Sequence, residues 1–206
     1  MIGLRTSVGR VHNRAIMQRR VRILAEYMAR LLPHDLDVLD IGCGDGRIGR
    51  AVMDLRPDVR VHGIDVMLRP TTAIPVDRFD GEHIELPDRG VGAVMMVDVV
   101  HHAYNPVALI TEAARVSAHA LVIKDHLRDG FLARTTLRAM DWVGNAPHGV
   151  VLPYNYLSRG EWDDAFKTAE VTIDAWEGAL GLYPGPASYV FDRGLHFAAR
   201  LTHPGE

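Results

Sequence analysis

A glycine-rich segment flanked by acidic residues is the part of this sequence best suited to binding a ligand. Residues 38–49 read Val-Leu-Asp-Ile-Gly-Cys-Gly-Asp-Gly-Arg-Ile-Gly, a short apolar run that ends in glycines before an amphipathic pattern. Because glycine lacks a Cβ, such a turn can tighten and a ligand can lie against its backbone. Asp40 and Asp45 oppose an anionic pyrophosphate at this turn and suit a ligand that carries an ammonium and a sulfonium group. The segment therefore predicts binding of a nucleotide-like ligand with positive charge.

The same glycines also fit the fingerprint of a dinucleotide-binding protein. Gly44, Gly46 and Gly49 match the pattern G-x-G-x-x-G, and Asp65 lies 19 residues after Gly46. An acid at that offset, at the end of a second strand, can accept hydrogen bonds from both hydroxyls of a ribose. We expect Asp65 to bind a ribose in either class of ligand, and the acids around the turn favour the cationic ligand over NAD.

A second group of polar residues could carry out proton transfer. Asp98, His101 and His102 follow one apolar run, and Asp125 and His126 follow the next. Histidine titrates near neutral pH and is the natural general base there. We predict that His102 or His126 removes a proton from an acceptor, that Asp125 orients a histidine or binds the acceptor, and that His101 contacts the acceptor.

The elements that must position these residues alternate between strands and helices. The spacing of apolar residues predicts strands at 37–41, 59–64, 74–79, 91–97, 120–123, 171–176 and 196–201, and helices at 11–32, 46–56, 131–140 and 159–168, with a further helix that begins at Pro106. This alternation implies a parallel, doubly wound sheet, in which ligands bind beyond the carboxyl ends of the strands. The acids and histidines named above fall at such ends, so we expect them to line one site.

Residues 126–157 form an excursion between the fifth strand and the late helix, and we expect it to contact the substrate. It is rich in polar and aromatic side chains and is interrupted by glycines and prolines. Such side chains on a loop at the ligand end of a sheet are candidates for recognition. The predicted substrate contacts within it are Trp142, Asn145, His148, Tyr154 and Tyr156. Alternatively, the aromatic side chains only pack the excursion against the rest of the chain.

The segment 38–49 and the order of the elements resemble class I S-adenosylmethionine (SAM)-dependent methyltransferases, and the excursion looks like that of uncharacterised small bacterial methyltransferases of the type 11 kind. The resemblance covers residues 35–125 well and the remainder loosely. It implies an α/β, Rossmann-like, doubly wound, mainly parallel seven-stranded sheet with an antiparallel C-terminal strand, in one domain over residues 1–206. It also implies SAM as cofactor. The cofactor contacts that it implies are Asp40, Gly42, Cys43, Gly44, Asp45, Asp65, Val66, Asp80, Gly81 and Asp98, with Asp80 accepting from the adenine amine.

The resemblance implies transfer of a methyl group to a small molecule, and the histidines favour an oxygen acceptor. Some O-methyltransferases hold Mg²⁺ with acids after the fourth and fifth strands, where Asp98 and Asp125 lie. Here Lys124 and His126 replace the acid-amide neighbours of that group, and Mg²⁺ prefers oxygen ligands, so no metal is predicted. A Mg²⁺-assisted enzyme, an N- or C-methyltransferase, and a non-catalytic SAM-binding regulatory or partner-binding protein stay open as alternatives.

The composition argues against several other classes of protein. The chain has 206 residues, a formal net charge of −3, 48% hydrophobic residues and a single cysteine, Cys43. Nothing global suggests nucleic-acid binding, and Asp98-Val-Val-His101 stands where a base-amine methyltransferase would carry an Asn/Asp-Pro-Pro-Tyr/Phe sequence. One cysteine excludes an intrachain disulfide, and no signal peptide or long apolar span is found. We therefore expect a cytoplasmic monomer or homodimer that binds a small-molecule acceptor and neither nucleic acid nor membrane.

Overall fold

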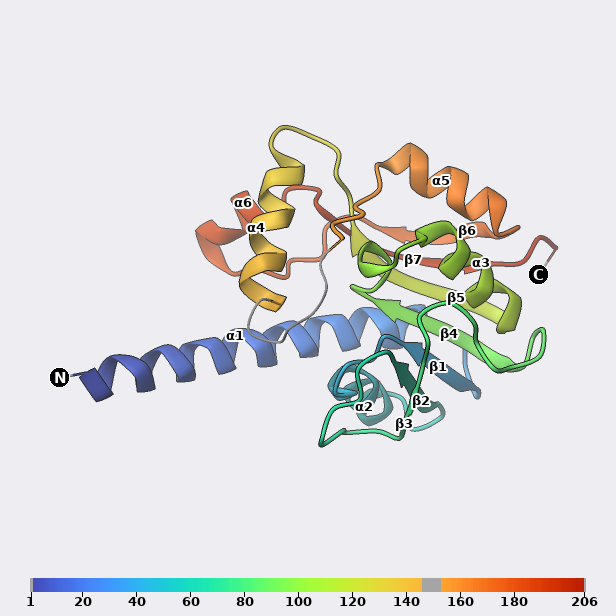
Figure 1. The fold of residues 1–206 in the computed structure, drawn as a ribbon, viewed down its shortest axis with the longest axis horizontal. Coiled ribbons are helices and arrows are strands. Elements are labelled where there is room, and N and C mark those ends of the chain that lie inside the picture. The colour runs from blue at the N-terminus through green and yellow to red at the C-terminus, as the bar shows by residue number, and fades with distance from the viewer. Residues whose placement is uncertain (1, 146–152, 206) are drawn as a thin grey trace.

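Seven strands form a single sheet in the order β3-β2-β1-β4-β5-β7-β6 (Figure 1). The computed structural model describes residues 2–145 and 153–205, and side chains for residues 17–142 and 153–205. The strands are β1 (Asp37–Ile41), β2 (Arg60–Asp65), β3 (Val76–Arg78), β4 (Val91–Val97), β5 (Ser117–His126), β6 (Thr172–Glu177) and β7 (His196–Thr202). Strands β1 to β5 pair in parallel, and β7 runs antiparallel between β5 and β6. The predicted Rossmann-like sheet with an antiparallel C-terminal strand is confirmed.

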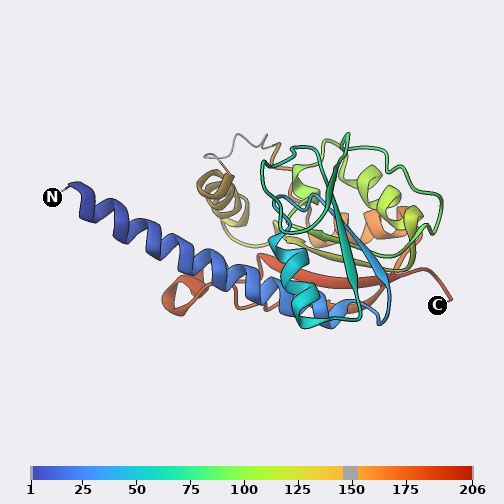
Figure 2. The same cartoon turned by 90° about the horizontal axis from the view of Figure 1, so that it is seen from below.

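Helices cover both faces of this sheet. They are α1 (Ile2–Leu31), α2 (Arg47–Leu55), α3 (Pro106–Val116), α4 (Ala133–Asn145), α5 (Arg159–Thr168) and α6 (Ser188–Phe191), with short 3₁₀ helices η1 (Val100–His102) and η3 (Gly185–Ala187). Helices α1 and α2 share one buried cluster with the sheet, and α3 and α5 share the other. The N-terminal part of α1 extends well beyond the sheet (Figures 1 and 2).

The alternation of side chains along the central strands explains this layering. In β4, Ala93, Met95 and Val97 pack toward α1 and α2, whereas Val94 and Met96 pack toward α3 and α5. Successive side chains of a strand point to opposite faces, so a strand covered on both faces must be apolar throughout. The nearly continuous apolar run in the sequence is therefore the signature of the centre of this sheet.

One strand differs from its predicted bounds in a way that affects the site. Strand β5 runs to His126 instead of ending at Ile123, because β7 pairs with its last residues as far as His126 and His196. Asp125 and His126 therefore lie within a strand and not on a loop. Residues 79–90 join β3 to β4 without a helix, and a groove of about 830 Å³ lies over β1 and β2 on that face.

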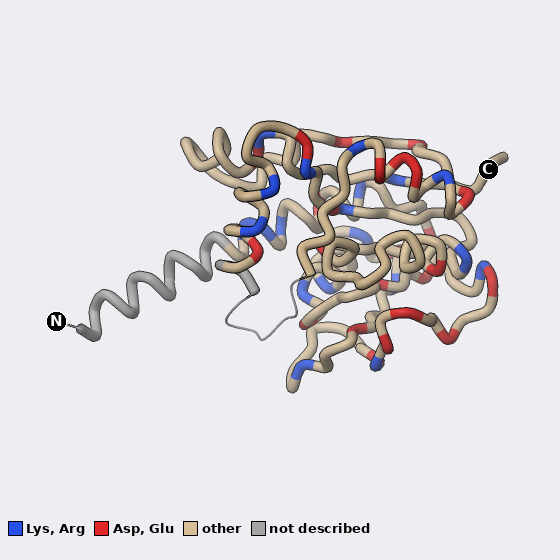
Figure 3. The backbone as a smooth tube through the Cα atoms, turned by 45° about the horizontal axis from the view of Figure 1, so that its top comes forward, with Lys and Arg blue, Asp and Glu red and all other residues tan. Residues whose placement is uncertain are grey.

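Charged residues of both signs are mixed over the described part of the chain (Figure 3). None of the helices there has the length and apolar character needed to cross a bilayer. The N-terminus of α3 is formed as the sequence predicts, because the Asn105 side chain accepts from the Ala108 N–H at 3.1 Å and Pro106 occupies the first turn. This cap fixes the chain that leads away from η1, which carries His101 and His102.

Candidate cofactor and acceptor site

The glycine turn after β1 leaves an open backbone surface. Gly42 and Gly44 have φ values of 68° and 61°, in the left-handed region that favours glycine. A Cβ on Gly42 would lie 2.7 Å from the methyl groups of Val99, so the neighbouring loop requires glycine there. A Cβ on Gly44 would meet no atom within 4 Å, so a ligand can approach this backbone closely.

Two acids border this open surface. Asp65, at the end of β2, accepts the Gly44 N–H at 2.7 Å and the Met67 N–H at 2.8 Å, one with each carboxylate oxygen. Each oxygen keeps a further lone pair, so the fixed carboxylate can still accept from a ligand hydroxyl. Asp40 is buried, and its side chain forms no hydrogen bond among the described residues. Burial and the neighbouring charge of Asp65 raise the pKa of Asp40 well above its usual range. A cationic ligand group would stabilise the ionised form of Asp40, which fits SAM.

Three other predicted cofactor contacts, Cys43, Asp45 and Val66, lie at or near this turn. The Cys43 thiol packs against Gly63, where an added Cβ would lie 2.4 Å from sulfur, and burial raises its pKa. Asp45 is paired with Arg47 at 2.6 Å, so its charge is already compensated. Val66 follows Asp65 and is 55% exposed. Cys43 therefore packs against β2 at Gly63, whereas Val66 offers an apolar surface beside Asp65.

Asp80 and Gly81 form an exposed turn after β3. One oxygen of Asp80 accepts the backbone N–H groups of Glu82 and His83, both at 2.8 Å, and these bonds lower the pKa of Asp80. The carboxylate keeps a second oxygen without such a bond. Asp80 therefore stabilises its own turn, and its proposed contact with adenine remains compatible with this role.

Asp98 is the centre of a charged network that connects α1 to the end of the sheet. It lies at φ 59°, which is strained for a residue with a side chain. Its carboxylate accepts from Arg20 of α1 at 2.5 Å and from Lys124 of β5. Burial and the positive charge of Arg20 lower the pKa of Lys124, and Asp98 opposes that shift. The pKa of Asp98 lies well below its usual range because both cations outweigh the effect of burial.

Sequence reasoning did not identify three members of this network as site residues. Arg20 lies in the predicted helix 11–32 without an assigned role. Lys124 was noted only because it and His126 replace the acid-amide neighbours of a Mg²⁺ site, and His196 only began a predicted strand. Lys124 is fully buried, and its ammonium group lies 3.4 Å from Nδ1 of His196. A lysine in an otherwise apolar central strand is the signal that could have revealed the network, because lysine is almost never buried without a partner.

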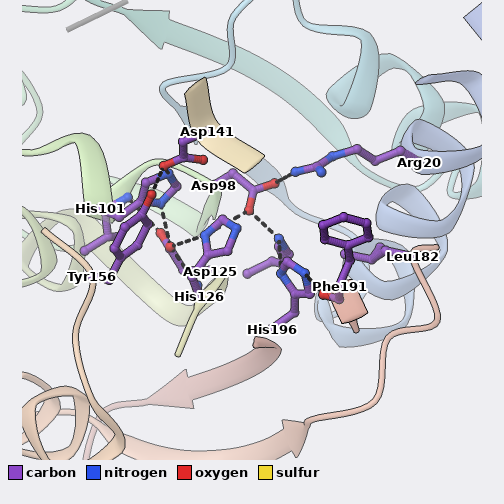
Figure 4. A network of polar contacts seen from close by, with 12 residues as sticks. Arg20, Asp98, His101, Asp125, His126, Asp141, Tyr156, Leu182, Phe191 and His196 are labelled. Atoms are coloured by element: carbon purple, nitrogen blue, oxygen red, sulfur yellow. Dashed lines mark hydrogen bonds and ion pairs between the residues drawn. The ribbon is translucent and has the colours of Figure 1, made fainter. Parts of the chain in front are cut away.

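Asp125 organises the histidines at the ends of β4 and β5 (Figure 4). One of its oxygens accepts from Nδ1 of His101 at 2.6 Å and from the backbone N–H of His126 at 2.7 Å, and it lies 3.1 Å from Nδ1 of His126. The other oxygen accepts the Val100 N–H at 2.9 Å. These bonds hold the pKa of Asp125 below its usual value despite complete burial. One carboxylate therefore fixes the orientation of two imidazole rings.

The three neighbouring histidines have different protonation equilibria. Burial alone would lower the pKa of His101, but Asp125 and Asp141 raise it to about 10. Burial and the positive charge of His101 lower the pKa of His102 to about 4. Burial, Lys124 and His101 likewise lower the pKa of His126. Without a ligand, His102 and His126 are therefore neutral at pH 7.

Asn155, in the excursion after β5, forms hydrogen bonds with backbone carbonyls in and next to η1. Asn155 donates its N–H to the His101 carbonyl at 3.1 Å and its side-chain amide to the Ala103 carbonyl at 2.8 Å. Tyr156 is buried, and its hydroxyl donates to Asp141 of α4. Asp141 and Asn155 were not among the predicted contacts.

The remaining predicted substrate contacts differ in their surroundings: some are packed and one is exposed. The Tyr154 ring lies 4.6 Å from the guanidinium of Arg138 and packs near Tyr156, so both tyrosines help to pack the excursion. Trp142 is 65% exposed on α4 and free to contact a ligand. The side chain of Asn145 and all of His148 lie outside the described residues.

Comparisons with known proteins identify the family of this chain and structures that share its fold. A family model described as a methyltransferase domain matches residues 12–175. A putative methyltransferase from Haloferax volcanii, solved with its Trm112 methyltransferase activator, superposes with a TM-score of 0.69 at 14% identity, covering 97% of this chain and 96% of that one. A SAM-dependent methyltransferase from Mesorhizobium loti gives 0.61 at 16% identity, covering 84% and 94%. The search of curated proteins found no match.

A third similar structure carries ligands. It is the geranyl diphosphate C-methyltransferase of Streptomyces coelicolor, in complex with Mg²⁺, geranyl diphosphate and S-adenosyl-L-homocysteine, with a TM-score of 0.64 at 12% identity, covering 87% of this chain and 78% of that one. At such identities these likenesses concern the fold. The fold and the acidic glycine turn define a Rossmann-like methyltransferase. Because the family model spans most of the sequence, the chain belongs to the methyltransferase domain family and is an enzyme that uses SAM.

Proposed function

We propose that this enzyme methylates an oxygen atom of a small molecule, with Asp40, Gly44 and Asp65 holding the cofactor and His126 acting as general base. When bound, SAM supplies an activated methyl group on a sulfonium centre, which leaves as a neutral thioether. The side chains then have two tasks, which are to align the acceptor and to remove its proton. Alignment alone can contribute about 7–11 kcal/mol to lowering the barrier.

The observation that carries the choice of base is the contact between His126 and Asp125. Nδ1 of His126 lies 3.1 Å from the carboxylate, whereas no hydrogen bond within the described residues reaches Nε2. A carboxylate beside Nδ1 favours the tautomer with its proton on Nδ1 and leaves the lone pair on Nε2 as the base. In the proposed step the acceptor oxygen gains the methyl group, and its proton passes to Nε2 of His126. Asp125 stabilises the resulting imidazolium.

The Mg²⁺-assisted alternative is less well supported, because both of its acids already have cationic or hydrogen-bonded partners. Asp98 is paired with Arg20 and Lys124, and these cations would repel an incoming Mg²⁺. Asp125 accepts from His101, His126 and the Val100 N–H. Neither carboxylate is available as a ligand without breaking buried contacts.

The test of this proposal compares His126→Ala with His119→Ala, which removes an exposed histidine of the same strand. Labelled SAM is incubated with fractionated small molecules from a cell extract until an acceptor is found, and turnover and SAM affinity are then measured separately. We expect kcat of His126→Ala to fall about 100-fold, as for loss of a general base, with SAM affinity within about twofold of the parent. His119→Ala should behave as the parent.

Two results would contradict the proposal. Unchanged turnover in His126→Ala would exclude this histidine as the base. A product whose new methyl group is bound to nitrogen or carbon, as read by NMR, would exclude oxygen as the acceptor atom.

A further inference from the structure

We propose that His101, His102 and Asp141 bind a divalent first-row transition-metal ion beside the proposed base. Each offers one ligand atom, and these three atoms lie within 4.8 Å of one another. His101 and His102 come from η1, whereas Asp141 comes from α4, so the site joins the end of β4 to the excursion after β5. The proposal concerns the ion alone and does not depend on the identity of the acceptor.

The strongest observation is that each of the two histidines has a buried ring nitrogen that lacks a hydrogen-bond partner. Among the described residues, the buried side-chain nitrogens without one are Nε2 of His101, Nδ1 of His102 and Nε of Arg19. His101 is only 2% exposed, so its ring is shielded from bulk solvent. A buried polar atom without a partner destabilises the folded protein. A metal ion would occupy both imidazole lone pairs at once.

The distances and the surrounding bonds also suit a metal ion. Nε2 of His101 and Oδ2 of Asp141 are 3.3 Å apart. Two ligands at about 2.0–2.2 Å from a tetrahedral ion lie about 3.4 Å apart, so this pair is already spaced as neighbouring ligands. His101 contacts Asp125 through its other ring nitrogen, and Tyr156 donates to Asp141. Metal-ligating histidines almost always donate their second N–H to such a partner, which orients the ring.

A simple ion pair between a protonated His101 and Asp141 explains less of the structure. Their 3.3 Å contact lacks hydrogen-bond geometry, because Nε2 of His101 has no hydrogen-bond partner. It also leaves Nδ1 of His102 buried and unpaired. Two imidazoles with one carboxylate are ligands typical of Zn²⁺ or Fe²⁺, whereas Mg²⁺ prefers oxygen alone. This site replaces the metal-free expectation from the sequence and uses neither Asp98 nor Asp125 as a ligand.

The test uses untagged, chelator-treated full-length protein titrated with Co²⁺ and followed by visible absorption, with Zn²⁺ as competitor. We expect one Co²⁺ per chain, displaced by Zn²⁺ and not by Mg²⁺. His102→Ala and Asp141→Asn should each weaken binding by about 100-fold or more, because each removes a direct ligand; losses of about 10–100-fold are typical even for the outer partners. His119→Ala, an exposed histidine, should leave Co²⁺ affinity unchanged.

Calorimetric SAM titration of the same preparations shows that each variant is folded and tests the cofactor site independently. Absence of saturable Co²⁺ binding to protein that still binds SAM would overturn the metal site and leave the proposed function intact. The same conclusion follows if His102→Ala and Asp141→Asn bind Co²⁺ as tightly as the parent. Equal weakening in His119→Ala would also overturn it, because binding would then be a surface effect of histidines in general.

Discussion

Replacing Lys124 by methionine tests whether its buried charge stabilises the fold through the network around Asp98. Lys124 is fully buried in β5, and its ammonium group donates to Asp98, which also accepts from Arg20 of α1 at 2.5 Å. Methionine is similar in volume, so the substitution removes the charge and creates little cavity. It leaves the buried carboxylate of Asp98 with one cationic partner instead of two.

The expected cost follows from this geometry. Removing one partner of a buried ion pair typically destabilises a protein by about 3–5 kcal/mol, because the remaining charge stays buried. Arg20 stays paired with Asp98, so we expect the lower end, about 3 kcal/mol in the free energy of unfolding. For a chain of this size, about 2–4 °C is lost per kcal/mol, which predicts a fall in Tm of about 6–12 °C.

The measurement is urea and thermal unfolding followed by circular dichroism. Lys167→Met is the matched control, because Lys167 is the other lysine of the chain and is exposed on α5. Its effect should stay within about 0.5 kcal/mol. If Lys124→Met unfolds within about 1 kcal/mol of the parent, the ammonium contributes no net stabilisation, and the inference that Lys124 stabilises the fold through Asp98 is wrong.

Two further predictions concern the cofactor site and the response to acid. Asp65→Ala removes the acceptor expected for the ribose and leaves the N–H groups of Gly44 and Met67 without their partner, so SAM binding measured by calorimetry should weaken by about 1–3 kcal/mol. The control Asp77→Ala, on the exposed edge strand β3, should bind SAM as the parent does. Equal affinities for Asp65→Ala and the parent would refute the ribose contact. Contacts with Arg115 and the Ile84 N–H lower the pKa of Glu112 from 4.5 to about 2, so its stabilising contribution is present above pH 4.5 and is lost as pH falls through about 2. Glu112→Gln should therefore unfold more easily than the parent at pH 7, and this difference should shrink toward pH 2; a difference that does not change with pH would show that the effect is not one of charge.

Much of the fold was predictable because its signals are local. The apolar run Val91–Val97 identified the buried central strand, and the glycines after Ile41 identified the turn that β1 forms with α2. Asp65 was predicted at the end of β2 from its offset alone, and the structure places it against the Gly44 N–H. Such features depend on side-chain periodicity and on backbone conformations that few residues adopt. They can therefore be predicted without knowledge of the tertiary contacts.

The strand ends were also predictable in part. A parallel sheet brings the residues after its strands to one edge, and on that ground Asp125, His101 and His126 were expected close together, as the structure shows. What the sequence did not reveal is the extension of β5 through His126, because that extension depends on pairing with β7, which lies about seventy residues later in the chain.

The partners of these residues were decided only by the tertiary structure. Arg20 reaches Asp98 from a helix at the start of the chain, and Asp141 and Tyr156 reach His101 from an excursion that the sequence marks only as polar and aromatic. The strength of a charge and the pKa of a histidine depend on burial and on the groups packed against them, and both are set by contacts between distant segments. The sequence by itself therefore determined the sheet, the turn and the class of ligand, whereas packing decided which histidine has a carboxylate partner, which charges are paired, and which nitrogens are left for a further ligand.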